Sequence, residues 1–371
     1  MAGNFVQLHN HTHYSLLDGA SKVPDLVKRV KELGMPAVGI TDHGNMHGAY
    51  ELWRAAVDSG VKPIIGIEAY VTPETARQDK TRVSWDTNWT PVPGHARNPD
   101  DVSGGGLITH LTMWAENDEG LVNLIKASSV ANLEGRVMRY PRMDKEVLST
   151  YSKGVIASSG CPSGIIQTRL RLGQFDEALR AAGEFQDIFG KDNFYIELMD
   201  HGLSIESKVT GDLLTIAKKL GAPLLATNDS HYVMEADKDA QDAMLCINSG
   251  ATLDDPNRFK FEGSGYYIKS AEEMRELFKD HPDACDNTLE IAERCNVIFD
   301  DHEDGAFMPQ FDCPEGWDET SLFLKKVEEG LEKRYDGNPP MEVLKQADYE
   351  CGVICQMQFC GYFLVVADYI N

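Results

Sequence analysis

The chain has 371 residues, enough for one large domain with an appendage or for two domains, and its 59 acidic and 35 basic side chains give a net charge of −24. This charge excludes broad, sequence-independent affinity for nucleic acid, because such affinity depends on lysine and arginine side chains that neutralise phosphates. The eight cysteines show no paired framework spacing, and no segment resembles a signal peptide or an apolar membrane span, so we expect reduced thiols and a cytoplasmic protein without membrane association.

The first predicted strand places histidines on one face. It covers residues 5–15, and because alternate side chains of a strand share a face, His9 and His11 point the same way. Two imidazoles held like this can bind one divalent metal ion or two neighbouring ones. His13 lies further along the same face, where we expect a supporting or surface role, and Asp18 follows the strand as a further potential ligand.

Five further apolar, β-rich segments lead into residues that can bind metal. If these strands run parallel, their carboxyl ends meet at one edge, where α/β folds place their chemistry. The pattern therefore predicts a polynuclear metal site at that edge. Asp42 is expected to orient His43 or another imidazole rather than to bind metal itself. The segments are Ala37–Thr41 before Asp42 and His43, Lys62–Ile67 before Glu68, Gly106–Thr109 before His110, Gly154–Gly160 before Cys161, and Pro223–Asn228 before Asp229 and His231.

Segments with helical period alternate with the strands. A seventh strand is predicted at Phe194–Leu198, and seven strands with interleaved helices predict a barrel-like parallel sheet. Thr72–Gly106 lacks periodicity and is rich in Pro, Asn, Asp and Gly, which is typical of a long insertion loop. The predicted helices are Ser21–Gly34, Ala49–Val57, Glu119–Asn132, Ser163–Phe189 and Ile205–Leu220.

The character of the chain changes after Ile298. An acidic loop is followed by an amphipathic helix over Thr320–Tyr335, and a second helical segment starts at Met341. The final apolar run, Gly361–Ile370, needs a core to bury it, so we expect this chain to be the front end of a longer protein. Residues 1–298 are predicted to form one α/β domain, and residues 299–371 a linker with a helical extension.

These motifs together resemble the PHP (polymerase and histidinol phosphatase) domain at the N-terminus of bacterial DNA polymerase III alpha subunits, in detail the actinobacterial type. The resemblance continues through Gly263–Phe278 and Gly361–Val366, the latter resembling the start of the polymerase palm. It implies a distorted TIM-like (β/α)7 barrel and a mainly helical extension that leads into a truncated palm. The motifs are His9–His11, Ser15–Gly19, Thr41–Met46, Gly66–Glu68, Ser159–Pro162 and Asn228–His231.

The same resemblance implies a set of nine metal ligands, all of which are present here. A complete set favours an active metal-dependent 3′→5′ exonuclease, with Asp18, Glu68 and Asp229 as its catalytic carboxylates. The insertion at 72–106 makes His110 the ligand whose assignment depends most on the structure. The nine are His9, His11, Asp18, His43, Glu68, His110, Cys161, Asp229 and His231. His201, just after the strand at Phe194–Leu198, is predicted to contact a substrate phosphate.

The ligand types indicate which metals and partners to expect. Imidazole, thiolate and carboxylate together suit zinc, manganese or iron better than magnesium, which prefers oxygen ligands. We expect three divalent ions, with zinc as the first choice, and in-line hydrolysis of a phosphodiester. The expected partners are the DNA primer 3′ end, the remainder of the polymerase chain, and the sliding clamp and other replisome subunits. The fragment itself is not expected to polymerise, since the resemblance puts the catalytic aspartates of the palm beyond Asn371.

Two other functions are compatible with these residues. A phosphomonoesterase like histidinol phosphatase would use the same metals, but the unfinished apolar run Gly361–Ile370 argues against a free-standing enzyme. A catalytically silent, metal-stabilised interaction domain of the polymerase is the second alternative, and the complete ligand set argues against it.

Overall fold

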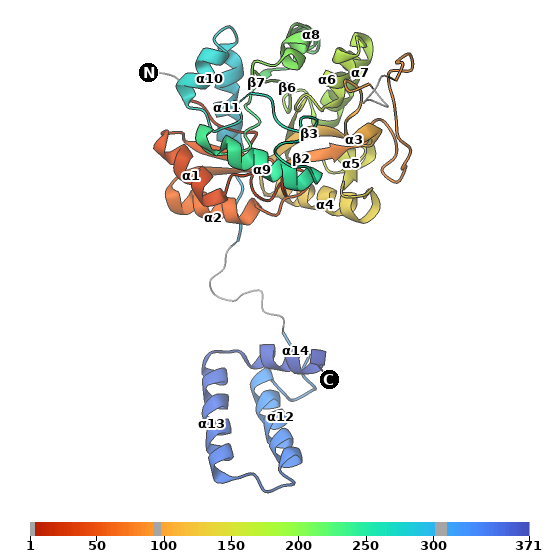
Figure 1. The fold of residues 1–371 in the computed structure, drawn as a ribbon. Coiled ribbons are helices and arrows are strands. Elements are labelled where there is room, and N and C mark those ends of the chain that lie inside the picture. Colours follow the sequence, from red (N-terminus) through yellow and green to blue (C-terminus); the bar gives the residue numbers. More distant parts are fainter. Residues whose placement is uncertain (1–3, 92–97, 264, 301–309, 371) are drawn as a thin grey trace. The chain divides into compact units, whose positions relative to one another are not determined.

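The computed structural model describes residues 4–91, 98–263, 265–300 and 310–370, which belong to two compact units (Figure 1). The first unit is Met1–Phe299 and the second is Asp300–Asn371. The division lies beside the predicted change of character after Ile298. The first unit contains the whole sheet, and the regular elements among the described residues of the second are helices.

A curled seven-stranded sheet forms the centre of the first unit, and helices lie around it (Figure 1). The strand order is β1-β2-β3-β5-β6-β7, with β4 paired to β2. This arrangement confirms the predicted barrel-like α/β class. The strands are β1 (Ala37–Ile40), β2 (Lys62–Val71), β3 (Thr109–Ala115), β4 (Arg142–Met143), β5 (Val155–Ser158), β6 (Phe194–Leu198) and β7 (Leu224–Ala226).

The helices lie where the sequence predicts them, except that one predicted helix is divided into two. The predicted helix Ser163–Phe189 is two helices, because Gly173 adopts a left-handed conformation (φ 74°) that ends the first of them. The first unit has α1 (Val23–Glu32), α2 (Ala49–Ser59), α3 (Ser103–Gly106), α4 (Asp118–Glu134), α5 (Lys145–Thr150), α6 (Ile165–Arg171), α7 (Phe175–Phe189), α8 (Ser204–Leu220), the 3-10 helix η1 (Glu235–Asp237), α9 (Lys238–Ser249), α10 (Ala271–Leu277) and α11 (Pro282–Arg294).

The predicted first strand is wrong as a continuous strand. Residues 5–15 make only isolated bridges, from Gln7 to Val38, from Asn10 to Ser230 and from Thr12 to Ser21. Side chains take over part of the backbone hydrogen bonding here, since the Thr41 hydroxyl accepts from the amide of Asn10 at 3.1 Å. The segment nevertheless lies between β1 and the residues after β7, so it joins the two ends of the sheet.

The prediction of an all-parallel sheet is also wrong at one strand. β3 runs antiparallel to both of its neighbours, β2 and β5. The reason lies in the connection, because the chain leaves β2 at Val71 and re-enters the sheet directly beside it at Thr109. Such direct re-entry brings the chain back into the sheet at the edge where it left, since Val71 pairs with Thr109. His110, at the start of β3, therefore lies at the same edge as the carboxyl ends of the parallel strands.

The barrel interior changes from apolar to polar toward the carboxyl end of β7. Leu225 belongs to an apolar cluster inside the barrel, whereas Thr227, just after the strand, donates its hydroxyl to the buried carboxylate of Glu197. Trp114 belongs to the apolar layer and donates its indole N–H to the carbonyl of Leu8 at 3.0 Å. Side chains of α11 join this cluster. The apolar layer leaves the carboxyl edge of the barrel for polar chemistry.

The second unit comprises α12 (Glu319–Arg334), α13 (Met341–Gln356) and α14 (Cys360–Ile370). Its small core includes Leu322, Phe323, Cys351, Cys360 and Leu364. No single helix in the described part of the chain is long and apolar enough to cross a membrane. Helices α13 and α14 reach the length and hydropathy of a span only when taken together, and they are bent by 113° relative to each other.

A buried arginine ties the predicted insertion loop to the barrel. The guanidinium of Arg142 is fully buried and donates to the carbonyls of Arg77 and Asp79 in the loop, both at 2.7 Å. It also donates to the carbonyls of Leu107 at 3.2 Å and Gly135 at 3.1 Å. One charged side chain thus satisfies carbonyls from three separate segments.

We predict that Arg142→Met lowers the free energy of unfolding by about 3 kcal/mol, because several buried carbonyls lose a charged donor. Urea denaturation followed by circular dichroism measures this change. Lys126→Gln, at an exposed lysine of α4, is the control and is expected to change stability by less than about 0.5 kcal/mol. An unchanged midpoint for Arg142→Met would contradict the role given to this side chain.

Candidate metal centre

Nine side chains converge at the carboxyl edge of the barrel, and they are the nine named from the sequence. Three groups among them have donor atoms within 4.8 Å of one another: His11, His43 and His231; His9, His11 and Asp229; and His43, Glu68 and His110. The remaining two make direct contacts with these groups, because Asp18 lies 2.8 Å from His43 Nε2 and Cys161 Sγ lies 3.4 Å from His110 Nδ1.

Glu68 lies at the centre of the cluster. Its side chain is 1% exposed, and its two carboxylate oxygens face four imidazoles. The nearest nitrogens are those of His43 at 2.8 Å and His110 at 3.1 Å, followed by His11 at 3.3 Å and His9 at 3.6 Å. One carboxylate therefore links ligands that come from β2, β3 and the segments beside β1.

Asp229 forms the second link. Its Oδ1 lies 3.0 Å from His11 Nε2 and 3.4 Å from His9 Nε2. The residue adopts φ 43°, a left-handed conformation that Asp tolerates better than most residues. The turn allows His231, two residues later, to reach the same centre.

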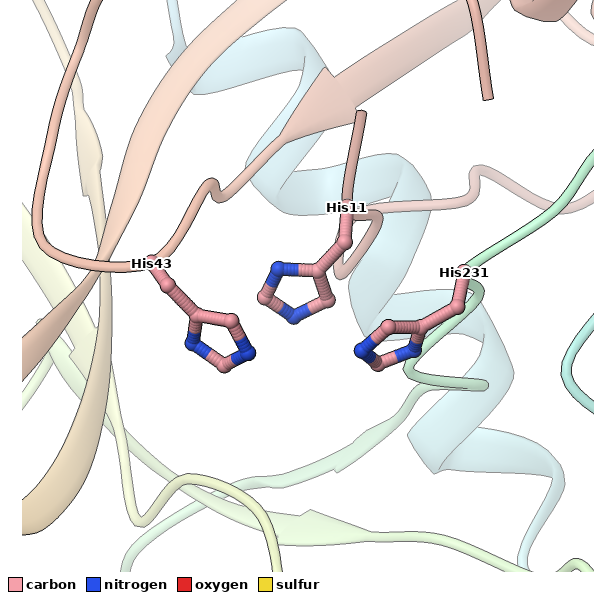
Figure 2. A group of neighbouring side chains, drawn as sticks. All are labelled: His11, His43 and His231. Atoms are coloured by element: carbon pink, nitrogen blue, oxygen red, sulfur yellow. The ribbon is translucent and has the colours of Figure 1, made fainter. Parts of the chain in front are cut away.

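Figure 2 shows how three imidazoles from distant segments lie beside one another. The ring of His11 stacks between those of His43 and His231, with centroid distances of 4.1 and 4.3 Å. Gly44 makes the approach of His43 possible, because it adopts φ 64° and an added Cβ would lie 2.7 Å from the Tyr70 ring. A larger residue there would push the chain away from the barrel.

Several donor atoms of the cluster are buried and make no well-aligned hydrogen bond, although they lie close to one another. Within the described residues they include Nε2 of His9 and of His11, Nδ1 of His43, Oε2 of Glu68 and Oδ1 of Asp229. Buried polar atoms are normally satisfied, and each unsatisfied one costs free energy. These atoms face one another, so cations between them would satisfy the whole set. The residues present thus fit divalent metal ions.

The charges of the cluster lead to the same conclusion. Burial by itself lowers the pKa of His9, but the carboxylates of Asp229, Glu197 and Glu68 outweigh it and raise that pKa well above its usual value. Burial, together with Glu68 and Asp229, raises the pKa of Cys161 well above its ordinary value. The carboxylates therefore require positive charge nearby. Protons on the imidazoles can supply this charge, and bound metal ions would supply it instead of the protons.

A carboxylate that the sequence did not single out orients His9. Glu197, in β6, is fully buried, and its Oε1 lies 2.7 Å from His9 Nδ1. Thr227 donates to the same oxygen at 2.5 Å, and Ser158 donates to the other one. With Nδ1–H donated to Glu197, the Nε2 lone pair of His9 points into the cluster. The sequence offered one signal for this role, because Glu197 is the single acidic residue in the otherwise apolar strand Phe194–Leu198.

Asp42 acts as predicted, as an orienting residue. It accepts from the amide of Thr12 and from the hydroxyl of Ser15, both at 2.7 Å. Ser15 in turn lies 3.1 Å from His11 Nδ1, and since its own proton goes to Asp42, it accepts from the imidazole. This leaves His11 Nε2 free to act as a ligand.

His231 is held by its own turn. Its Nδ1 lies 2.7 Å from the carbonyl oxygen of Asp229, which fixes Nδ1 as the donor. Burial and the neighbouring His11 lower the pKa of His231 to about 4, so its imidazole is neutral near pH 7. A neutral imidazole with a free Nε2 is the form that binds metal.

The predicted substrate contact through His201 finds no support in this geometry. Its side chain is 2% exposed, and both ring nitrogens already have partners. Nδ1 lies 2.6 Å from Glu206, and Nε2 lies 2.8 Å from the carbonyl of Asn228. The ring also stacks on Tyr266, with a centroid distance of 4.1 Å. In this structure His201 braces the segment after β7 and offers no nitrogen to a phosphate.

A curled α/β sheet whose carboxyl edge carries clustered histidine and carboxylate side chains belongs to the class of α/β barrels that is suited to metal-dependent chemistry. Comparison with known families agrees, since the model of the PHP domain matches residues 7–201. The chain belongs to the PHP domain family. Residues 321–371 match a second model, described as the bacterial DNA polymerase III alpha NTPase domain.

Curated relatives of the chain include several DNA polymerase III alpha subunits. The chain is 50% identical to that of Mycobacterium leprae over 369 residues, which cover 99% of this chain and 31% of the relative. The subunit of Saccharopolyspora erythraea is also 50% identical, over 98% of this chain and 30% of the relative. The chain thus spans about a third of these proteins. A solved Bifidobacterium adolescentis structure, assigned as a metal-dependent phosphoesterase, is 14% identical, has a TM-score of 0.35, and covers 74% of this chain and 96% of that one.

We predict that Glu197→Gln weakens metal binding by roughly 10- to 100-fold, because the amide no longer fixes the proton on His9 Nδ1. Competition with a chromophoric chelator measures the affinity. Glu177→Gln, in the first turn of α7, is the matched control and should leave the affinity unchanged. Equal affinities for Glu197→Gln and the unmodified chain would mean that His9 does not depend on this carboxylate.

Proposed function

We propose that the chain is the PHP region of a replicative DNA polymerase III alpha subunit and acts as a metal-dependent 3′→5′ exonuclease that proofreads the primer end. The observation that carries the proposal is the complete cluster of inward-facing donors with unsatisfied buried atoms at the carboxyl edge of the barrel. A domain that had lost its chemistry would not need to keep such a cluster.

We propose the nine clustered side chains as ligands of three divalent ions, with zinc as the first choice and manganese or iron as substitutes. The mixture of imidazole, thiolate and carboxylate supports this choice. When bound, such ions lower the pKa of a water molecule, which can then act as the nucleophile. They also neutralise the negative charge that develops during in-line displacement at phosphorus.

The three carboxylates have different roles in this proposal. Glu68 is buried and contacts four histidines, and Asp229 contacts three, so both hold the ligand array together. Asp18 is 21% exposed, lies beside His43 and lines the cavity next to the cluster, so it is the carboxylate that meets an incoming strand.

The proposed partners follow from the relatives. A chain that matches polymerase alpha subunits along almost its full length, and a polymerase model over residues 321–371, favours a polymerase domain over a free-standing phosphomonoesterase. We propose the primer 3′ end as substrate and the rest of the polymerase as its covalent partner. We further propose the sliding clamp and other replisome subunits as assembly partners, and the cytoplasm as the compartment.

We predict that crystals of the protein as isolated contain three metal ions at this cluster. Anomalous scattering measured at the zinc, iron and manganese edges identifies them, with the zinc edge expected to give the strongest signal. Peaks should lie about 2.0–2.3 Å from the donor atoms. Peaks elsewhere, or none in crystals grown with added zinc, would contradict the assignment.

We predict that Asp18→Asn abolishes hydrolysis of a single-stranded 3′ end, because it removes a charged ligand and disturbs activation of the water. Release of labelled mononucleotides from an oligonucleotide measures the activity. Lys333→Ala, in the charged helix α12, is the control and should retain full activity. Full activity in purified Asp18→Asn would show that the nuclease lies elsewhere or is a contaminant.

A further inference from the structure

A cavity of about 470 Å³ opens beside the cluster of ligands. Asp18 and His43 form part of its wall, and Arg136 and Arg139 line it as well. A volume of this size is sufficient for a nucleotide, whereas a lone phosphate needs much less. Leu17 is exposed at the cavity and provides an apolar wall beside the charged one.

The two arginines stand on a rigid hairpin between α4 and β4. Val137 and Tyr140 exchange backbone hydrogen bonds at 3.0 Å in both directions, and Val137 is buried in a small apolar cluster. The hairpin therefore has a fixed base. It carries Arg136 beside this base and Arg139 at the tip, and both side chains are exposed.

A hydrogen-bonded bridge connects this hairpin to the cluster of ligands. The Arg139 guanidinium donates to the Asn248 side-chain oxygen at 2.6 Å. The Asn248 amide donates in turn to the carbonyl of Leu17 at 3.2 Å, directly before Asp18. These hydrogen bonds between three separate segments thus fix the position of the Arg139 guanidinium relative to Asp18, a proposed metal ligand.

The local charge differs in sign from the charge of the chain. The chain has 59 acidic side chains, but Asp18 is the single carboxylate among the described residues that line this cavity. Two arginines line the same wall. An anion would meet a cationic wall here, although the net charge of −24 repels it elsewhere.

We propose that Arg136 and Arg139 bind the phosphodiester on the 5′ side of the scissile one and so hold a single-stranded 3′ end in the cavity. This inference rests on the proposed function, because it names the part of the strand that the exonuclease site recognises. Arginine suits phosphate binding, since its planar guanidinium can donate to two phosphate oxygens at once and keeps its charge at every relevant pH.

Two short substrates test the proposal in the 371-residue chain. A thymidine dinucleotide has only the scissile phosphodiester, whereas a trinucleotide has one more on the 5′ side. Arg136→Gln and Arg139→Gln should each lower kcat/KM for the trinucleotide by roughly fivefold and leave that for the dinucleotide unchanged. Arg54→Gln, at a half-exposed arginine of α2 outside the cavity, is the matched control and should change neither value.

The salt dependence provides a second readout. Because both arginines bind the same phosphodiester, the double variant Arg136→Gln with Arg139→Gln should reduce the slope of log KM against log salt on a longer single strand by about 0.7, the value for one lost phosphate contact. The double variant Arg136→Lys with Arg139→Lys keeps both charges and should retain the slope of the unmodified chain, which a misfolded variant would not do. Equal losses on both short substrates would place the arginines at the scissile phosphate and overturn the inference, as would no loss on either.

Failure of the proposed function gives a different result. If the unmodified, metal-loaded chain hydrolyses neither substrate, the exonuclease proposal fails. Fluorescence anisotropy with a phosphorothioate single strand then tests the arginines by binding alone. Weaker binding by Arg136→Gln and Arg139→Gln, with Arg54→Gln unchanged, supports the subsite. Equal binding by all of these proteins overturns it.

Discussion

The buried carboxylate of Glu68 is the constraint on which the rest of this structure depends. Removing an ionised carboxylate from water costs several kcal/mol unless opposite charge surrounds it, and here four imidazoles face it. Those imidazoles come from the N-terminal segment, from the turn after β1 and from β3, so the sheet has to bring three regions of the chain together. The apolar layer beneath, which includes Trp114, fixes the strands in the register that allows this.

Much of the site could be predicted from the sequence, because the end of a strand can be recognised from a short run of consecutive residues. An apolar run that ends in a donor residue specifies both the strand and the end at which the donor lies, which sufficed for His43, Cys161 and Asp229. Glu68 differs, because it lies within β2, which continues to Val71. His110 could not be placed in this way, since its position depends on the direction of β3. That direction follows from where the chain re-enters the sheet after residues 72–108, and no local pattern records it.

Other features could not be predicted because they depend on contacts across the barrel. Glu197 lies 188 positions from His9 in the sequence, and only the closed sheet brings the two side chains to 2.7 Å. The N-terminal segment has the alternation of a strand, yet side-chain acceptors such as Thr41 and Asp42 replace ladder hydrogen bonds there. His201 carried a plausible position after a strand, but Glu206 and Asn228 occupy both of its nitrogens.

The net negative charge of the chain is compatible with the proposed polyanionic substrate, because the substrate responds to the electrostatic field within the site. Debye screening limits exposed charges to about 8–10 Å in physiological salt, so the net charge of −24 acts weakly over the width of the barrel. Within that radius, the charge that a phosphate meets is set by a few side chains and by any bound cations. Metal ions would balance the carboxylates of the cluster, and Arg136 and Arg139 line the adjoining wall. In the proposed function, such a short-range field attracts a strand end only after something else has delivered it. This agrees with our proposal that the rest of a polymerase presents the primer to this chain, which spans about 30% of the length of its polymerase relatives.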